Sequence, residues 1–321
     1  MEPLVQIDRL SVHFPVKGRL PFQKKKFVRA VSDVSLAISP GEAFGLVGES
    51  GCGKSTLANA VLGMLRPTGG RVLFKGRDLS TLKPGGFKAL RRDMQMIFQD
   101  PFSSLNPRFT AYEIIAEPMR IRGGMTAAQR EARVAELLHL VGLSREDMCR
   151  YPSDFSGGQR QRIGIARAIA LNPEFLVCDE PVSALDVSVH AQILNLLMDL
   201  QRDLHITYLF ISHNLAVVKD ICASVAVMYL GAIMETGPTE QVFSKPLHPY
   251  TRSLLSAVLT IDLTHPPERV LLKGDIPSPI HVPEGCPFCT RCPFAKERCH
   301  KEKPLLREGE PGHFAACHFA G

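Results

Sequence analysis

The chain has 321 residues, of which 45% are hydrophobic and 22% charged, and its formal net charge is +6. This is ordinary globular composition, long enough for one large domain or two smaller ones. No apolar run approaches the roughly 18 to 20 residues that a membrane-spanning helix needs. The N-terminal segment lacks a basic stretch followed by a long apolar one, so we expect no secretory signal and a cytosolic chain.

The first half of the chain predicts a sheet and a glycine-rich turn. Apolar residues alternate over 5–14 and 28–38, which predicts two half-buried strands. The short apolar run 43–48 predicts a buried parallel strand, and a glycine-rich turn and a helix over about 55–65 follow it. A basic stretch between the first two strands, residues 17–29, is read as a solvated loop or as a contact for phospholipid headgroups.

The second half predicts helices that alternate with strands. Thr126 is a plausible N-cap for a helix over 126–142. Apolar strands over 175–180 and 207–213, with a helix over about 188–204 between them, form a crossover unit. From residue 264 prolines interrupt a stretch with no clear period, so we expect a main domain over 1–260 and a small cysteine-rich module over 261–321.

The segment GESGCGKST matches the pattern G-x-x-x-x-G-K-[ST] between a predicted strand and a predicted helix. Its glycines allow successive backbone N–H groups to surround phosphate oxygens, and the helix N-terminus adds partial positive charge. Lys54 is expected to bind the β- and γ-phosphates and the Ser55 hydroxyl to bind Mg²⁺. The predicted residues of this nucleoside triphosphate site are Gly48, Glu49, Ser50, Gly51, Cys52, Gly53, Lys54, Ser55 and Thr56.

Polar side chains end the two strands of the crossover unit. Asp179 and Glu180 end the first, and His213 ends the second. One carboxylate at such an edge can hold Mg²⁺, and its neighbour can act as general base on an attacking water. An acidic pair alone is weak evidence, and a histidine there can be structural.

The segment FSGGQRQR places its serine and glycines at the start of a helix, where free N–H groups can bind an anion. With FQDP, CDEP, SALD and ISH in this order, it resembles the ATP-binding subunit of an ABC transporter over about residues 4–260. The resemblance implies an α/β fold: an ABC-type P-loop NTPase with a RecA-like core, an antiparallel β subdomain and a helical signature subdomain. It also implies that two such subunits hold two ATP molecules between the P-loop of one chain and the SGGQ of the other.

The same resemblance assigns roles to individual residues. Glu180 is the catalytic base and His213 contacts the γ-phosphate, while Gln99 senses that phosphate and, with Ser55 and Asp179, the Mg²⁺ ion. The signature residues that contact ATP across the dimer are Ser156, Gly157, Gly158 and Gln159, and Asp186 communicates across it. Phe27 is preferred over Phe22 for stacking on adenine, the alternative for Phe27 being a packing role in its strand.

Three further segments, QDPFSSLNPR (99–108), HPYTRSLLSAV (248–258) and GDIPSPI (274–280), resemble the ATPases of di- and oligopeptide importers. The implied partners are a second, different ATPase, two membrane permease subunits and an extracytoplasmic solute-binding protein, with this chain peripheral at the cytoplasmic face of the inner membrane. The resemblance implies ATP-driven import of di- and oligopeptides, and glutathione and nickel remain alternatives because their importers belong to the same group. A soluble ABC ATPase would be expected to carry large insertions or tandem halves, and neither is present; exporters rarely carry the HPYTRSLL element and a cysteine-bearing tail. The absence of tryptophan and of basic-aromatic interleaving argues against a nucleic-acid partner.

Five of the nine cysteines lie in the last 36 residues: Cys286, Cys289, Cys292, Cys299 and Cys317. An odd total and a cytosolic location disfavour disulfides, so metal binding is the better interpretation. Four thiolates suit zinc or an iron–sulfur cluster, and this crowded spacing is closer to the latter.

The peptide-importer ATPases that the chain resembles hold a [4Fe–4S] cluster on a G-C-x5-C-x6-C…C tail. That pattern falls on Cys286, Cys292, Cys299 and Cys317, while Cys289 stands where the family usually has histidine and is spare or an alternative ligand. Zn²⁺ and unligated thiols remain alternatives, and His300, His313 and His318 are expected to be bystanders. Whether such a group is structural or redox-sensing stays open.

Overall fold

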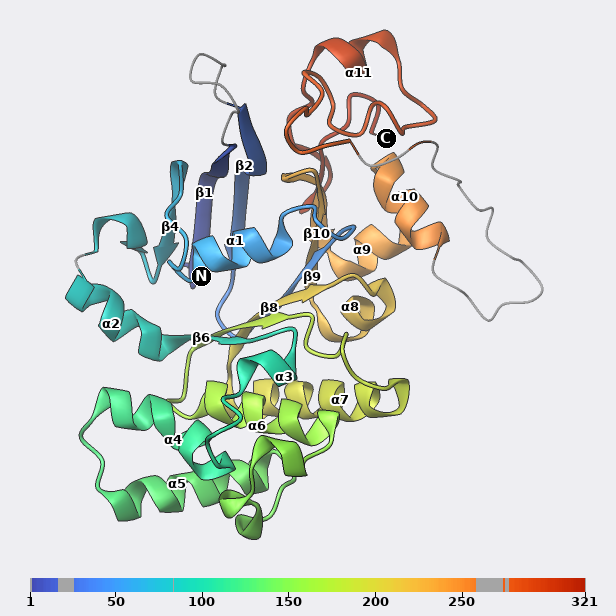
Figure 1. The fold of residues 1–321 in the computed structure, drawn as a ribbon. Helices are drawn as coiled ribbons and strands as arrows, with labels where there is room; N and C mark the ends of the chain where they lie inside the picture. Colours follow the sequence, from blue (N-terminus) through green and yellow to red (C-terminus); the bar gives the residue numbers. More distant parts are fainter. Residues whose placement is uncertain (1, 17–25, 83, 258–273, 275–276, 321) are drawn as a thin grey trace. The chain divides into compact units, whose positions relative to one another are not determined.

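The computed structural model describes residues 2–16, 26–82, 84–257, 274 and 277–320. Most of the basic stretch, Phe22 and the expected boundary near residue 260 lie outside the described residues. The chain divides into two compact units. Unit 1 comprises Met1–Thr81 and Ile211–Gly321, and unit 2 comprises Leu82–Phe210 (Figure 1). The cysteine-bearing tail thus belongs to the same unit as the predicted P-loop.

Unit 1 contains an antiparallel sheet with the strand order β2-β1-β4-β5. Its strands are β1 (Val5–Val16), β2 (Lys26–Ile38), β4 (Gly69–Phe74) and β5 (Arg77–Asp78). Buried and exposed residues alternate along β1 and β2, as expected for strands with one face on the core. The two strands predicted at the start of the chain are therefore confirmed.

The second set of strands in unit 1 runs in the order β11-β12-β10-β9-β3. These strands are β3 (Ala43–Val47), β9 (Ser224–Tyr229), β10 (Ala232–Pro238), β11 (Arg307–Glu310) and β12 (His313–Ala315). β3 pairs in parallel with β9, and the other pairs are antiparallel. All five residues of β3 are buried, which confirms the predicted buried strand. The tail contributes β12 directly to the edge of β10.

The helices of unit 1 are short. They are α1 (Lys54–Val61), η1 (Leu79–Thr81), α8 (Leu215–Ile221), α9 (Thr239–Ser244), α10 (Pro249–Ser256) and α11 (Glu297–Lys301). α1 ends earlier than the predicted residue 65. Gly63 adopts φ +65° and its N–H bonds to Ala60 O, which tightens and ends the last turn.

Unit 2 has the parallel strands β6 (Met94–Ile97) and β7 (Phe175–Asp179). β8 (Thr207–Ser212) begins in unit 2, and its residues Ile211 and Ser212 belong to unit 1; the strand order is β8-β7-β6. The helices of unit 2 are α2 (Pro84–Asp93), α3 (Pro101–Ser104), α4 (Ala111–Arg122), α5 (Ala127–Leu140), η2 (Arg145–Cys149), η3 (Pro152–Asp154), α6 (Gly157–Ile169) and α7 (Val187–Leu204). α7 connects β7 to β8, which confirms the predicted crossover.

Helix α5 begins where the sequence predicts. The Thr126 hydroxyl accepts from Gln129 N, and the Gln129 side chain accepts from Thr126 N, forming a capping box. The buried residues of α5 are Val134, Leu137 and Leu138, which lie on one face of the helix. α4 and α6 pack against α5, and Figure 1 shows the three helices together.

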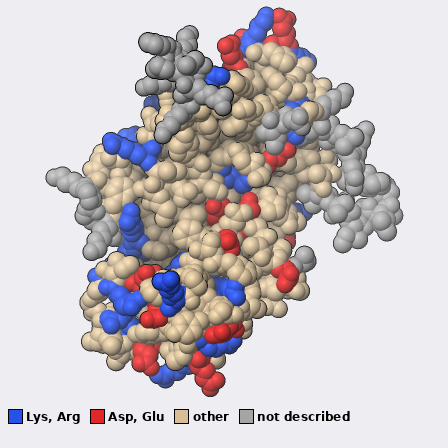
Figure 2. Space-filling view, viewed as in Figure 1, with Lys and Arg blue, Asp and Glu red and all other residues tan. Residues whose placement is uncertain are grey.

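None of the described helices is long and apolar enough to cross a membrane. On the face drawn in Figure 2, basic and acidic side chains are interspersed over the helical part of unit 2.

Candidate functional site

The P-loop, residues 48–54, runs from the end of β3 into α1 in unit 1. A Cβ atom on Gly48 would lie 2.1 Å from Met228 O, and one on Gly53 would lie 2.0 Å from Ala30 O. Gly53 also adopts φ +109°, a conformation that other residues rarely reach. The loop is therefore packed directly against the backbones of β9 and β2. Glycine is therefore needed at positions 48 and 53 because a side chain would clash with neighbouring backbone. The motif alone explained the glycines only by the access they give to backbone N–H groups.

Lys54 is only 5% exposed, and its ammonium group is held by the loop itself. Nζ donates to Gly48 O at 2.8 Å and to Glu49 O at 3.0 Å. The Cys52 thiol lies 3.9 Å from Nζ, and burial raises the pKa of this thiol. A phosphate bound here would offer the ammonium group charged oxygen acceptors in place of two neutral carbonyls.

Glu49 is tied to the rest of unit 1 through its side chain and its N–H. The N–H donates to Tyr250 Oη at 3.0 Å. The carboxylate forms a bidentate ion pair with Arg291, at 2.7 Å from Nη1 and 3.1 Å from Nη2. Neither partner was predicted, because both depend on segments about 200 or more residues away from the P-loop.

The remaining predicted nucleotide residues of unit 1 are exposed or partly exposed. Ser55 and Thr56 lie in the first turn of α1. His213 is exposed and directly follows β8. Phe27 lies in β2 and is 41% exposed, so its ring is available for stacking. Phe27 as the adenine-binding residue stays a prediction.

In unit 2, the predicted base and the predicted sensor are in contact. Gln99 Nε2 donates to Glu180 Oε2 at 3.0 Å. Glu180 has φ +46°, a left-handed conformation that is uncommon for a non-glycine residue. Asp179, the last residue of β7, is 6% exposed. The structure thus brings Gln99 and Glu180 together, and it strains the backbone at the residue expected to accept the proton.

The signature segment begins α6 through a capping box. The Ser156 hydroxyl accepts from Gln159 N at 3.3 Å, and Gln159 Oε1 accepts from Ser156 N at 3.0 Å. A Cβ atom on Gly158 would lie 2.5 Å from Val189 Cγ1, so α6 packs closely on α7 at this point. Asp186 is exposed and precedes α7 without a side-chain capping bond. The sequence identified this helix start as an anion site but did not identify the capping box.

The five tail cysteines line one cavity of about 250 Å³, together with phenylalanine, lysine and histidine side chains. Cys286 N donates to Cys299 O at 2.7 Å, which joins two segments of the cavity wall. Burial, and after it the neighbouring cysteines, raise the pKa of Cys286 to about 12. Among the described residues, no group of three or more His, Cys, Asp or Glu side chains is arranged to hold a metal ion.

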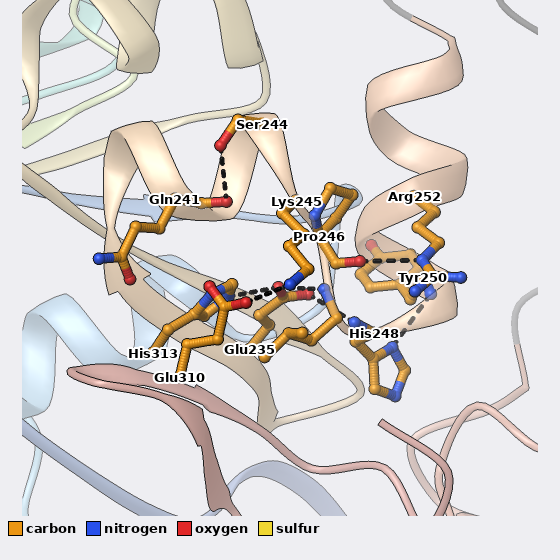
Figure 3. Close-up of polar contacts among 11 residues, drawn as sticks. Glu235, Gln241, Ser244, Lys245, Pro246, His248, Tyr250, Arg252, Glu310 and His313 are labelled. Atoms are coloured by element: carbon orange, nitrogen blue, oxygen red, sulfur yellow. Dashed lines mark hydrogen bonds and ion pairs between the residues drawn. The ribbon is translucent and has the colours of Figure 1, made fainter. Parts of the chain in front are cut away.

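A buried polar network holds residues 247 and 248 in place at the start of the segment HPYTRSLL (Figure 3). Glu235 on β10 is fully buried and accepts from Leu247 N at 2.7 Å and His248 N at 2.9 Å. His313 Nε2 on β12 lies 2.7 Å from the same carboxylate. His313 therefore has a structural partner in Glu235 and lies outside the set of residues that line the cysteine cavity.

His248 continues this network toward the P-loop. Its Nδ1 accepts from Tyr250 N at 3.0 Å and caps α10. Burial lowers the pKa of His248 to about 3, so the ring is neutral when folded. The Tyr250 hydroxyl in turn accepts from Glu49 N. The segment HPYTRSLL thus contacts the P-loop through Tyr250 and lines the cysteine cavity through His248.

Comparisons with known proteins agree over the whole chain. A family model described as "ABC transporter" matches residues 31–183, and one described as "Oligopeptide/dipeptide transporter, C-terminal region" matches residues 234–299. The chain is 48% identical over 321 residues to the oligopeptide transport ATP-binding protein AppF of Bacillus subtilis, covering 99% of this chain and 98% of that protein. It is 50% identical over 317 residues to a probable peptide ABC transporter ATP-binding protein of Sinorhizobium fredii, covering 99% of this chain and 90% of the relative.

Solved structures share the fold. The ATP-binding cassette MJ0796, in a dimeric post-hydrolysis state bound to ADP and Pi, is 28% identical with a TM-score of 0.65, over 73% of this chain and 98% of that chain. CbiO1 from Clostridium perfringens, part of an ABC transporter complex, is 25% identical with a TM-score of 0.66, over 76% of this chain and 92% of that chain.

Proposed function

Because the chain belongs to the ATP-binding proteins of oligopeptide and dipeptide ABC transporters, we propose that it hydrolyses ATP to power the import of peptides. The observation that carries the proposal is the presence of a P-loop, a Gln99–Glu180 contact and a capped signature helix in one chain of this family. The relatives' names refer to oligopeptides and peptides, which favours peptide over glutathione or nickel as the solute.

The residues of the chain divide the chemistry among themselves. The P-loop N–H groups and Lys54 bind the phosphates, and Lys54 exchanges its two carbonyl acceptors for phosphate oxygens. Glu180 accepts the proton of the attacking water, and the Gln99 amide orients its carboxylate. His213 contacts the γ-phosphate.

Mg²⁺ would be held by Ser55, Gln99 and Asp179. A hydroxyl, an amide and a carboxylate are hard oxygen donors of the kind that Mg²⁺ selects. When bound, the ion neutralises developing charge on the phosphates.

A second ATPase subunit is needed because each ATP is held between the P-loop of one subunit and the signature segment of the other. Ser156, Gly157, Gly158 and Gln159 serve the ATP held by a second ATPase subunit, and Asp186 lies next to α7 to report on that subunit. Two membrane permeases and a solute-binding protein complete the importer, with this chain peripheral at the cytoplasmic face of the inner membrane. Near Gln99, Phe98 is 41% and Phe102 is 56% exposed, and such aromatic side chains suit a groove for a permease helix.

The Glu180→Gln variant tests this function. We expect the assembled transporter carrying it to bind ATP with unchanged affinity and to lose roughly 100-fold or more of its turnover, because the amide cannot accept the proton. Glu136→Gln, at an exposed carboxylate that pairs with Arg133 on α5, is the matched control and should retain full activity. Full turnover by Glu180→Gln would remove Glu180 from the role of base.

We propose that the cysteine cavity holds an iron–sulfur cluster rather than a single ion. Thiolates around one zinc lie about 3.8 Å apart, given Zn–S bonds of about 2.3 Å. A [4Fe–4S] cluster binds each thiolate to a different iron, so its ligands stand further apart around a larger cavity. Five thiols line one cavity, and this supports Cys286, Cys292, Cys299 and Cys317, the positions that match the family pattern, as cluster ligands. The cluster would supply folding energy to a tail with little regular structure.

Anaerobic purification tests the cluster. We expect brown protein with about four iron and four sulfide per chain. Cys292→Ser should lose this absorbance and iron, whereas Cys289→Ser, at a spare position lining the same cavity, should retain both. Colourless protein with one zinc per chain would show that the cysteines bind zinc instead of a cluster.

A further inference from the structure

The turn that carries the cysteines, residues 286–292, is tied to the P-loop by a desolvated ion pair. The Arg291 side chain is 9% exposed and that of Glu49 is 24% exposed, and both guanidinium Nη atoms bond the carboxylate. Bidentate, partly buried pairs of this kind are far costlier to break than surface pairs. The pair between Arg298 and Glu302 in the same tail is more than half exposed and provides a contrast.

Glu49 is the P-loop residue through which the loop conformation is fixed. Its carboxylate binds Arg291, its N–H donates to Tyr250, and its carbonyl accepts from the phosphate-binding Lys54. A change in the position of Glu49 therefore moves the backbone of the phosphate-binding loop.

Arg291 is equally constrained on the cysteine side. It lies between Cys289 and Cys292, and the N–H groups of Arg291 and Cys292 both donate to Phe288 O at 3.0 Å. The Phe288 ring packs on Tyr250 and on Tyr229, each with centroids 5.3 Å apart. The turn that positions two cavity cysteines thus also positions the guanidinium group.

We propose that Arg291 is a positioning residue of the nucleotide site: it braces Glu49, so that nucleotide affinity depends on the order of the cysteine turn 286–292. The proposal rests on the proposed binding of nucleotide by the P-loop. Coupling between two sites is reciprocal, so nucleotide must also order the turn.

The sign of one substitution separates this brace from a simple charge effect. Glu49 is an anion close to where phosphates bind, so on charge alone Glu49→Gln should tighten nucleotide binding. If Glu49 acts through Arg291, the same isosteric change should weaken it.

The test measures Mg²⁺-ADP affinity by calorimetry on the full-length protein as purified. We expect Arg291→Met and Glu49→Gln each to weaken binding about tenfold, within the usual range of coupling between sites, and the double variant to be no weaker than either alone. Arg291→Lys, which keeps the charge but not the two-pronged geometry, should recover part of the loss. The control Arg298→Met should bind as wild type.

Hydrogen exchange provides the second readout. In wild type, Mg²⁺-ADP should slow amide exchange in residues 286–292, and Arg291→Met should abolish that effect while leaving α6 unchanged. Wild-type affinity in Glu49→Gln, or nucleotide protection of the turn that persists in Arg291→Met, overturns the brace. Wild-type protein that binds no nucleotide contradicts the proposed function instead.

Discussion

The close approach of neighbouring backbone restricts which amino acids the P-loop can contain as much as the expected ligand does. Gly53 shows this most clearly, because a Cβ atom there would approach Ala30 O to 2.0 Å. The side chain of Lys54 is held by two carbonyls of the same loop. At this scale, the loop is a structural element that packs closely against its neighbours.

We therefore expect Gly53→Ala to abolish measurable ATP binding, because the new methyl group must displace either β2 or the loop. The matched control is Gly41→Ala, where φ is also positive (+73°) but nothing lies within 4 Å of the added Cβ. That control should cost about 1 kcal/mol of stability and keep full affinity. Equilibrium binding of a fluorescent ATP analogue to both variants distinguishes the two cases, and normal binding by Gly53→Ala would contradict the packing argument.

Among the elements, helix starts in unit 2 use one device for different purposes. Thr110, Thr126 and Ser156 each begin a helix with a reciprocal capping box. In α4 and α5 the box stabilises the helix, whereas α6 carries the signature residues at the same place. The hydroxyl that caps α6 is thus shared between folding and the proposed contact with ATP.

Removing the hydroxyl separates these two roles. Thr126→Ala and Ser156→Ala should each lower the free energy of unfolding by about 1 kcal/mol, the usual cost of a lost N-cap. Only Ser156→Ala should also reduce ATP hydrolysis in the assembled transporter. Chemical denaturation and steady-state turnover of both variants check this, and equal turnover in the two would confine Ser156 to a capping role.

Local pattern predicted the strands β1, β2, β3, β7 and β8, the helices α5 and α7 and the P-loop, because each is encoded by contiguous residues. It could not predict Arg291 opposite Glu49 or His313 opposite Glu235, because these pairs join segments 242 and 78 residues apart. The end of α1 was placed too late, since Gly63 ends the helix through a positive φ that an apolar pattern does not reveal. Motif spacing finds ligand-facing residues, whereas the residues that hold them are visible only in three dimensions.

At the scale of the whole molecule, unit 1 depends on a buried histidine that must stay neutral. The folded pKa of His248 is about 3, held below the ordinary 6.5 first by burial and then by Arg252. Between these two pH values His248 is protonated in the unfolded chain and neutral in the folded one. The contribution of His248 to the free energy of unfolding is therefore complete above pH 6.5 and is lost as pH falls toward 3. Acid should therefore weaken the segment that supports both Glu49 and the cysteine turn.

We expect the free energy of unfolding to fall by about 1.4 kcal/mol from this residue between pH 8 and pH 5.5. His248→Asn keeps an acceptor for Tyr250 N and removes the titration, so its stability should depend less steeply on pH over that interval. Urea denaturation of both proteins at several pH values measures the difference in slope. Identical slopes would show that His248 does not titrate on unfolding.

Unit 1 is built from two pieces of chain that are separated by all of unit 2. During synthesis the ribosome releases residues 82–210 before the residues that complete unit 1. The P-loop emerges early, yet Tyr250 and Arg291, which hold Glu49, are translated some 200 and 242 residues after it. A nascent chain therefore carries its nucleotide-binding motif long before it carries the parts that fix it. On the proposed brace, the nucleotide site reaches its full affinity only once the tail has been translated.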